Sequence, residues 1–475
     1  MSVLSEIRPQ NVFSFFETIS SIPRGSGHTE RISQYCDCFA SDRGLKHFCD
    51  EIGNVVIFKD GSKGRENEEP LILQGHLDMV WEKDPDIEFD FMNSGLNLCT
   101  DGEYIFAKGT TLGGDDGIAV AICLAVLDDN SISHPPLEVI FTVDEETGME
   151  GARGIDVSSL KGKRMINLDS EAEDVLWVSC AGGARADISL EVKNEPNTLK
   201  AYRLLITGLH GGHSGAEIHK NYANANVLLG RTLKEISEKT DIYISSLWGG
   251  KAGNAITPLA ECVICTSDDI SGIVSDCEKR AKEEFAQSDP NIEFILTQCT
   301  AEKHFSKETG DRVISLLSLL PYGVIKMSGD IQGLVQTSLN PGILSSAENA
   351  VNVGWSVRSS VNSEKEELIN QLRILAEKHG ASFDTYGGYP AWEYRADSPL
   401  RDRIAECYTA LTGKKPGITA IHAGLECGLF SDKIKGLDSV SIGPDMQDIH
   451  TPREKLSIPS VKRIYELLLK VMEVI

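Results

Sequence analysis

Apolar strands alternate with helical segments along the first part of the chain, and this pattern limits the possible fold more than any other feature. A segment that reads as a buried helix, GIAVAICLAVL, lies between the second and third of four segments that read as strands: NVVIF, LILQGHLDMV, LEVIFTV and RMINLD. Such alternation predicts a mostly parallel sheet with helices on its faces. We therefore expect an α/β fold.

The pattern changes near Ala184 and returns after Pro390. The segment between them has longer strands, a turn rich in Gly and His, helices rich in Lys and Glu, and the alternating strand AVNVGWSVRSSV. A chain of 475 residues is also too long for one ordinary core. The prediction is a discontinuous α/β catalytic domain, residues 1–184 and 391–475, that carries a large inserted α+β lid domain, residues 185–390.

Composition and charge exclude several kinds of partner. Hydrophobic residues make up 41% of the chain, yet no apolar run is long enough to span a bilayer. The N-terminal MSVLSEIRPQ lacks the basic start and apolar segment of a signal peptide, so we expect a cytoplasmic protein. The net charge of -25 would repel a phosphate backbone or an anionic membrane, and we expect neither as a partner.

The twelve cysteines are scattered along the chain, and we interpret them as reduced thiols. Cys262 and Cys265 form a CxxC motif, but the segment ECVICT reads as a strand and no second pair lies nearby. Core cysteines are therefore the better interpretation than a zinc knuckle.

Polar side chains follow the predicted strands at the points where the strands end. His76 and Asp78 follow LILQG, and because they are two residues apart in an extended chain they point the same way. Ligands bind at this edge of an open α/β sheet, so clusters that are distant in sequence can converge there. The other clusters are Asp144, Glu145 and Glu146 after LEVIFTV, Asp169 after RMINL, His450 after VSIG and its loop, and Asp115 and Asp116 in the glycine-rich TLGGDDG.

Carboxylates and imidazoles in this ratio suit zinc, or less selectively manganese or cobalt. Each cluster alone is more often a turn, a hydrogen-bonded pair or an acidic helix start, but their joint occurrence at strand ends favours a metal site. If Glu146 binds a metal, the adjacent Glu145 cannot point the same way and is free to act as a general base. This arrangement indicates a hydrolase.

Motifs along most of the chain resemble one enzyme family, the aminoacyl-histidine dipeptidases of the bacterial peptidase D type. These belong to the co-catalytic zinc peptidase superfamily that also includes carboxypeptidase G, peptidase T and the carnosinases. The resemblance runs from about residue 10 to the C-terminus, and GGHSGAEIH and HAGLECG together are specific to the dipeptidase branch. The motifs are, in order, GHLDMV, TTLGGDDGIAVA, TVDEETGMEGA, NLDSE, GGHSGAEIH, GNAITP, VRSS, HAGLECG and IGPDMQDIHTPRE.

The resemblance implies a set of roles in the catalytic domain. Asp115 would bridge the two metals, Asp78 would orient His76, and Glu145 would be the general base for a metal-bridging hydroxide. The family also has a cis peptide after the bridging aspartate. Asp116 stands where peptidase D enzymes often have Asn, although other branches of the superfamily carry Asp there. The implied metal ligands are His76, Asp115, Glu146, Asp169 and His450.

The resemblance also implies residues that bind substrate. His213 would polarise the scissile carbonyl, while Asn254 and Arg358 would hold the substrate, with the Arg358 fork suited to a terminal carboxylate. Glu426 would bind the free amine, and the backbone around Gly428 would help to hold the carboxylate. Apart from the resemblance, His213 reads as a loop histidine, Arg358 as part of a surface ion pair and Glu426 as a helix cap.

The hypothesis is a cytosolic dipeptidase with two divalent metal ions, expected to be zinc with manganese or cobalt as alternatives. Its substrates would be dipeptides, including Xaa-His and carnosine-like β-Ala-His peptides. One alternative is an amidohydrolase of the same superfamily that acts on N-acyl amino acids. An acylated amine has no positive charge, so Glu426 would have no group to bind in such a substrate. Another is a non-catalytic, metal-dependent binding protein, which would not need Glu145. A homodimer is expected from the resemblance alone.

Overall fold

The computed structural model describes residues 3–475 and divides into two compact units. The first contains the residues up to Ser179 together with Tyr394–Ala420 and Leu425–Ile475, and the second contains Cys180–Glu393 and Ile421–Gly424. The short segment Ile421–Gly424, which the sequence analysis assigned to the catalytic domain, thus packs with the second unit. None of the helices in the described part of the chain is long and apolar enough to cross a membrane.

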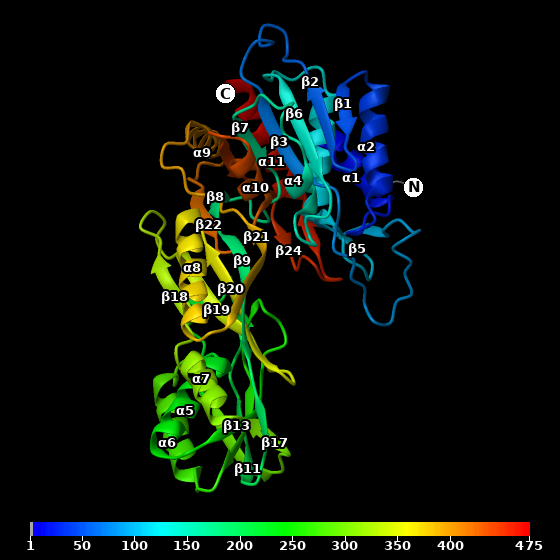
Figure 1. Cartoon of the computed structure of the whole chain (residues 1–475). Helices are drawn as coiled ribbons and strands as arrows, with labels where there is room; N and C mark the ends of the chain where they lie inside the picture. Colours follow the sequence, from blue (N-terminus) through cyan, green and yellow to red (C-terminus); the bar gives the residue numbers. More distant parts are fainter. Residues whose placement is uncertain (1–2) are drawn as a thin grey trace. The chain divides into compact units, whose positions relative to one another are not determined.

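The first unit is built on an eight-stranded sheet in the order β1-β2-β6-β3-β7-β23-β8-β22 (Figure 1). The four central strands β6, β3, β7 and β23 pair in parallel, whereas β1, β2 and β8 pair antiparallel with their neighbours. The α/β prediction is confirmed, with the parallel part confined to the centre. The strands are β1 (Lys46–Cys49), β2 (Val55–Lys59), β3 (Leu71–His76), β6 (Leu137–Thr142), β7 (Arg164–Asn167), β8 (Val175–Cys180), β22 (Gly417–Ile421) and β23 (Asp438–Ser441).

The predicted buried helix is the centre of the first unit's core. It is α3 (Gly114–Asp128), in which every residue from Gly114 to Leu127 is buried, and it packs against β3 and α1. The other helices are α1 (Gln10–Ser20), α2 (Glu30–Asp42), α4 (Glu150–Gly154), α9 (Pro399–Thr412), α10 (Glu426–Lys433) and α11 (Ile458–Val474). A small second sheet has the order β24 (Met446–Gln447), β25 (Lys455–Ser457), β5 (Tyr104–Ala107) and β4 (Leu98–Thr100).

The second unit is built on a nine-stranded antiparallel sheet, which agrees with its predicted α+β character. Its main order is β16-β11-β15-β13-β19-β20-β9-β21, and β18 pairs with β19. The strands are β9 (Gly182–Glu191), β11 (Lys200–Thr207), β13 (Tyr243–Gly249), β15 (Ala260–Thr266), β16 (Glu293–Cys299), β18 (Gly323–Met327), β19 (Val335–Ser346), β20 (Ala350–Ser359) and β21 (Ser382–Tyr389). Two short ladders pair β10 (Asn194–Pro196) with β17 (Lys303–Phe305) and β12 (Gly212–His213) with β14 (Ala255–Ile256).

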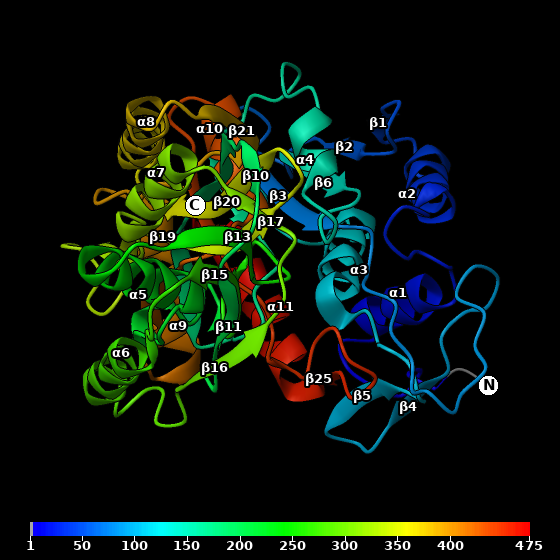
Figure 2. The same ribbon diagram turned by 60° about the horizontal axis from the view of Figure 1, so that its bottom comes forward.

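Helices cover this sheet in two groups (Figure 2). The helices α5 (Ala225–Lys239), α6 (Ser271–Glu284) and α7 (Lys307–Ser318) pack beside β11, β13, β15 and β16, and α8 (Asn362–Lys378) packs on β9, β20 and β21. A one-turn 3₁₀ helix, η1, spans Ile218–Lys220. In β20 the alternating residues Val351, Val353, Trp355 and Val357 are fully buried in the core.

Cys262 and Cys265 lie in β15, and both are fully buried. Cys262 belongs to the hydrophobic core of the second unit, and both thiols are free. They pack as apolar side chains, as the sequence analysis expected.

Candidate active site

Three parallel strands bring polar residues to one edge of the first unit's sheet. His76 is the last residue of β3, while Glu145 and Glu146 follow β6 and Asp169 follows β7. Because β3 pairs in parallel with both β6 and β7, the carboxyl ends of these strands lie side by side. Asp115 joins them from the start of α3. The convergence expected from the sequence is therefore present in the structure.

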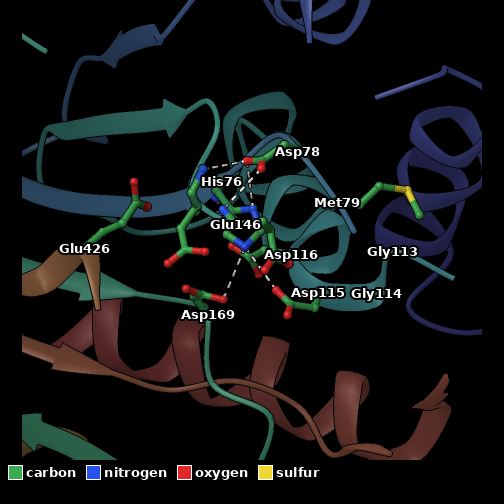
Figure 3. Close-up of polar contacts among 12 residues, drawn as sticks. His76, Asp78, Met79, Gly113, Gly114, Asp115, Asp116, Glu146, Asp169 and Glu426 are labelled. Atoms are coloured by element: carbon green, nitrogen blue, oxygen red, sulfur yellow. Dashed lines mark hydrogen bonds and ion pairs between the residues drawn. The ribbon is translucent and has the colours of Figure 1, made fainter. Parts of the chain in front are cut away.

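The carboxylate of Asp115 lies between two histidines. Its Oδ1 is 3.0 Å from His76 Nε2, and its Oδ2 is 3.1 Å from His450 Nε2. Asp169 Oδ1 lies 3.5 Å from His76 Nε2 (Figure 3). Glu146 Oε1 lies 2.9 Å from His450 Nε2. The five predicted ligands thus form two groups that share Asp115.

The donor set fits divalent metal ions. Ligand atoms of Asp115, Glu146 and His450 lie within 4.8 Å of one another, and so do those of His76, Asp116 and Asp169. Burial raises the pKa of Asp169 well above its ordinary value, and the nearby Asp115 and Glu145 carboxylates raise it further. Buried carboxylates that repel one another in this way are stabilised by bound cations, and imidazole with carboxylate is the donor set of zinc, manganese and cobalt sites.

Asp78 connects His76 to the acidic turn after β6. It is fully buried, and its Oδ1 lies 3.3 Å from His76 Nδ1. The same oxygen accepts the backbone N–H of Glu145 at 3.0 Å, while Oδ2 accepts the Ser26 hydroxyl at 2.7 Å and the Glu146 N–H at 3.3 Å (Figure 3). One carboxylate therefore contacts the imidazole and holds the backbone that carries Glu145 and Glu146.

The peptide bond between Asp115 and Asp116 is cis, as the resemblance implied. Asp116 is fully buried and turns back toward β3, where its Oδ2 accepts the backbone N–H of His76 at 3.0 Å. Burial raises the pKa of Asp116 well above its ordinary value, and the Asp169 carboxylate raises it further. Asp116 thus holds the end of β3 in place beside Asp115.

Two charged residues that the sequence analysis did not identify hold the loop before Asp115. Glu454 is 3% exposed, and its Oε2 accepts the N–H groups of Leu112 at 2.7 Å and Gly113 at 3.0 Å. Its Oε1 accepts those of Gly114 at 2.7 Å and Asp115 at 3.4 Å. The carboxylate therefore binds four consecutive backbone amides, the last of which belongs to Asp115.

Arg24 holds the same loop from the other side. It is 2% exposed, donates to the carbonyls of Leu77 at 3.0 Å and Asp78 at 2.9 Å, and also donates to the carbonyl of Gly113. Gly113 has φ +61°, and a Cβ there would lie 2.5 Å from Arg24 Nη2. The glycines of TLGGDDG were the one signal in the sequence of close packing at this loop.

Glu426 starts α10 and is fully buried beside β3 and β6. Its Oε2 accepts hydrogen bonds from Gln74 Nε2 at 2.5 Å and Thr142 Oγ1 at 2.8 Å, whereas its Oε1 has no partner within the described residues. Burial raises its pKa to about 7. Figure 3 shows Glu426 beside the cluster that contains His76 and Glu146. Gly428, two residues later, donates its N–H to the Leu425 carbonyl, so this group serves the helix.

The second unit brings His213, Asn254 and Arg358 together. The ladder of β12 and β14 places His213 opposite Ala255, and the N–H of Ser214 donates to the Asn254 carbonyl at 2.8 Å. A Cβ on Gly215 would lie 3.0 Å from His213 Cε1 and 3.2 Å from Arg358 Nε. The motifs GGHSG, GNAITP and SVRSS, which are far apart in the sequence, therefore meet in space.

The His213 ring has a defined orientation. Its Nδ1 accepts the backbone N–H groups of Gly215 at 3.3 Å and Ala216 at 3.0 Å. Burial lowers the pKa of His213, and the positive charge of Arg358 lowers it further. The neutral ring therefore carries its proton on Nε2, where it can be donated to an oxygen.

His219 and His422, which belong to the matched motifs GGHSGAEIH and HAGLECG, differ in their surroundings. His219 lies in η1, and His422 is 6% exposed with its Nε2 2.7 Å from the Ser338 hydroxyl. Burial lowers the pKa of His422 to about 3, and Arg358 contributes in the same direction. His422 therefore stays neutral and acts as a hydrogen-bonding group in the wall beside Arg358.

Comparison with known proteins agrees with the site. Residues 72–474 match the model of peptidase family M20/M25/M40. The chain is 38% identical to the cytosol non-specific dipeptidase of Escherichia coli (strain K12), over 100% of this chain and 99% of the relative. A crystal structure of the aminoacylhistidine dipeptidase from Vibrio alginolyticus has a TM-score of 0.94 and 36% identity, covering 99% of this chain and 98% of that chain. Aminopeptidase PepT from Bacillus cereus, with a TM-score of 0.58, 15% identity and 98% coverage of both chains, shares the fold. The resemblance noted from the motifs is confirmed, and the chain belongs to peptidase family M20/M25/M40.

Proposed function

We propose that this chain is a cytosolic metal-dependent dipeptidase that hydrolyses Xaa-Xaa dipeptides, Xaa-His among them. The observation that carries the proposal is the position of Asp115, whose two carboxylate oxygens face two histidines in separate groups of candidate ligands. The relatives from Escherichia coli and Vibrio alginolyticus, both named as dipeptidases, support the substrate class because they match this chain over nearly its whole length.

The proposed cofactor is a pair of divalent ions, with zinc favoured over manganese and cobalt. His76 and Asp169 would hold one ion, His450 and Glu146 the other, and Asp115 both. Such ions supply charge that polarises a carbonyl and lowers the pKa of water toward neutrality. The crowding of buried carboxylates supports this assignment, because carboxylates gathered so closely are stabilised by bound cations.

Glu145 is the proposed general base. Burial raises its pKa well above its ordinary value, and the neighbouring Glu426 and Glu146 carboxylates act in the same direction. A carboxylate whose proton affinity is raised can accept a proton from the attacking water and deliver it to the leaving amine. Asp78, through the backbone N–H of Glu145, keeps this base at the edge of the sheet.

The second unit supplies the proposed groups for the rest of the substrate. His213 donates Nε2–H to the oxygen of the scissile carbonyl, and Arg358 binds the terminal carboxylate with help from Asn254. In the first unit, the free Oε1 of Glu426 accepts the substrate amine. An N-acyl amino acid has no such amine, so the role of Glu426 separates a dipeptidase from an amidohydrolase.

We also propose different roles for the two domains. We assign the metal centre to the catalytic domain of residues 1–184 and 391–475, and the lid function to residues 185–390, close to the division of the chain into compact units. A homodimer is proposed from family resemblance, and the mass measured by light scattering at several concentrations tests it.

The test is release of histidine from Gly-His and β-Ala-His by protein that has been stripped of metal and reloaded with zinc, manganese or cobalt. We expect metal-dependent release that Glu145→Gln reduces by at least two orders of magnitude while metal binding persists. Glu150→Gln is the matched control, because Glu150 lies on the exposed surface of α4. If folded, metal-loaded protein hydrolysed no dipeptide, the proposal would be wrong, and N-acyl amino acids would be tested next.

A further inference from the structure

A second arginine lies beside Arg358 in the second unit. Arg185 is in β9 opposite Ser356 of β20, and Arg358 is in β20 opposite Gly183 of β9. Residues two apart on a strand share a face, so Arg185 and Arg358 are diagonal neighbours on one face of the same ladder. Gly183 has no side chain, and the space next to it contains the Tyr389 ring, whose hydroxyl accepts from Arg358 Nη1 at 3.0 Å.

Arg185 also lies against the substrate loop that carries Asn254. A Cβ on Gly253 would lie 2.8 Å from Arg185 Nη1, so the guanidinium packs directly on the backbone beside Asn254. His213 and Arg358 lie close to each other beside Gly215, because a Cβ on that glycine would lie 3.0 Å from His213 Cε1 and 3.2 Å from Arg358 Nε. Arg185 is therefore part of the cluster that contains the proposed substrate residues of this unit.

The two guanidiniums are only partly compensated by the protein. Arg185 Nη1 and Arg358 Nε are buried and have no hydrogen-bond partner among the described residues. Burial lowers the pKa of Arg185, and the positive charge of Arg358 lowers it further. Asp187 lies on the same face and its negative charge attracts Arg185, but burial raises the pKa of Asp187 and its carboxylate also accepts a hydrogen bond from the Tyr386 hydroxyl.

Two like charges that are partly desolvated and have free N–H groups are costly unless an anion binds to them. Arg358 alone accounts for one carboxylate, the α-carboxylate of a dipeptide. The guanidinium of Arg185, the diagonal neighbour of Arg358, can form paired hydrogen bonds to a second carboxylate on the same C-terminal residue of the substrate. A C-terminal Asp or Glu carries two carboxylates only a few bonds apart, which matches the two forks.

We propose that Arg185 is a specificity-determining residue that binds an acidic side chain on the C-terminal residue of the substrate. This inference rests on the proposed dipeptidase function. It adds Xaa-Asp and Xaa-Glu to the substrates that the enzyme favours, because Arg185 binds the side-chain carboxylate while Arg358 binds the terminal one.

The experiment compares Ala-Glu with Ala-Gln, which has the same shape without the charge. Both are measured with the metal-loaded full-length protein and with the variants Arg185→Gln and Arg185→Lys. A hydrogen bond between two charged groups is stronger than one between neutral groups, so we expect kcat/KM for Ala-Glu to exceed that for Ala-Gln by about tenfold. The preference should lie mainly in KM, since the contact is remote from the reacting bond.

Arg185→Gln is expected to abolish the preference, and Arg185→Lys to retain part of it because the charge remains. Arg203→Gln is the matched control: Arg203 belongs to the same sheet, is half exposed and pairs with Glu261, and its removal should leave the ratio unchanged. A second measurement uses the wild-type protein alone. The ratio of kcat/KM for Ala-Glu to that for Ala-Gln should fall as the ionic strength rises, because salt screens the attraction between the charges.

The outcomes separate the two proposals. Equal kcat/KM for Ala-Glu and Ala-Gln in the wild type would overturn the role of Arg185 and leave the dipeptidase function intact. A preference for Ala-Glu that survives in Arg185→Gln would have the same meaning. Failure to hydrolyse either dipeptide would instead contradict the proposed function.

Discussion

Replacement of Glu454 by alanine removes the acceptor of four consecutive buried amides, from Leu112 to Asp115. Three of these hydrogen bonds are 2.7–3.0 Å long and the fourth is 3.4 Å. A buried donor left without a partner costs about 1–3 kcal/mol. Removal of one partner of a buried charged pair typically costs about 3–5 kcal/mol. Relaxation of the loop around the four amides keeps their combined cost near this second range. We therefore expect the loop before Asp115 to be destabilised by about 3–5 kcal/mol.

Hydrogen exchange at the amides of Leu112–Asp115 measures this directly. A loss of 3 kcal/mol corresponds to exchange that is about a hundredfold faster in that segment. Because the loop positions Asp115, we also expect metal affinity, measured by competition with a chromophoric chelator, to fall by about 10–100-fold. Glu454→Gln should lose nearly as much, since its amide N–H₂ would face one of the two pairs of donors.

Glu138 provides the matched control. It is also 3% exposed, and it accepts the backbone N–H groups of Lys161 at 2.8 Å and Gly162 at 2.9 Å. It lies near the start of β6, whereas the candidate metal ligands follow the end of that strand. Glu138→Ala should lower stability without changing metal affinity. Equal metal affinity in Glu454→Ala and the wild type, with faster exchange in the loop, would refute the positioning role, and unchanged exchange would refute the argument from buried amides.

Three further predictions concern the rest of the molecule. Chelation of the metals should lower the melting temperature and zinc should restore it, because bound cations stabilise the buried carboxylates; a melting temperature that does not respond to chelation would contradict this. Burial lowers the pKa of His422 from 6.5 to about 3, so the unfolded chain binds a proton that the folded chain does not, and stability should fall as the pH decreases from about 6.5 toward 3. His422→Gln should reduce that slope in urea unfolding at several pH values, and an unchanged slope would mean that His422 is protonated in the fold. Gly215→Ala would place a Cβ 2.6 Å from the His422 carbonyl and 3.0 Å from the His213 ring, so turnover should fall by at least tenfold with metal affinity unchanged, and full activity would show that the loop adapts.

The α/β character could be predicted from the sequence because strands and helices are each marked by local patterns of apolar residues. A buried strand such as Leu71–His76 and a buried helix such as Gly114–Asp128 are visible as apolar runs of the right length. The pairing of strands is not visible in this way. That the central strands are parallel while β1, β2 and β8 run antiparallel to their neighbours depends on contacts between segments far apart in the chain.

Several candidate metal ligands were likewise accessible from the sequence, since His76, Glu146 and Asp169 lie at or shortly after the ends of strands that must meet in a parallel sheet. The residues that hold these ligands in position could not be predicted from the sequence. Glu454 reaches amides 340 residues away, and only the folded chain shows that its two oxygens bind four of them. No local pattern distinguishes such a carboxylate from an exposed one.

Arg185 illustrates the same limit most clearly. In the sequence it is one of many charged residues on an alternating strand. Only the register of β9 with β20 makes it the diagonal neighbour of Arg358, and only the approach of the Gly253 backbone leaves its guanidinium partly desolvated. Local periodicity determines which face of a strand a side chain occupies, but tertiary packing decides which charge stands beside it and whether water can reach it.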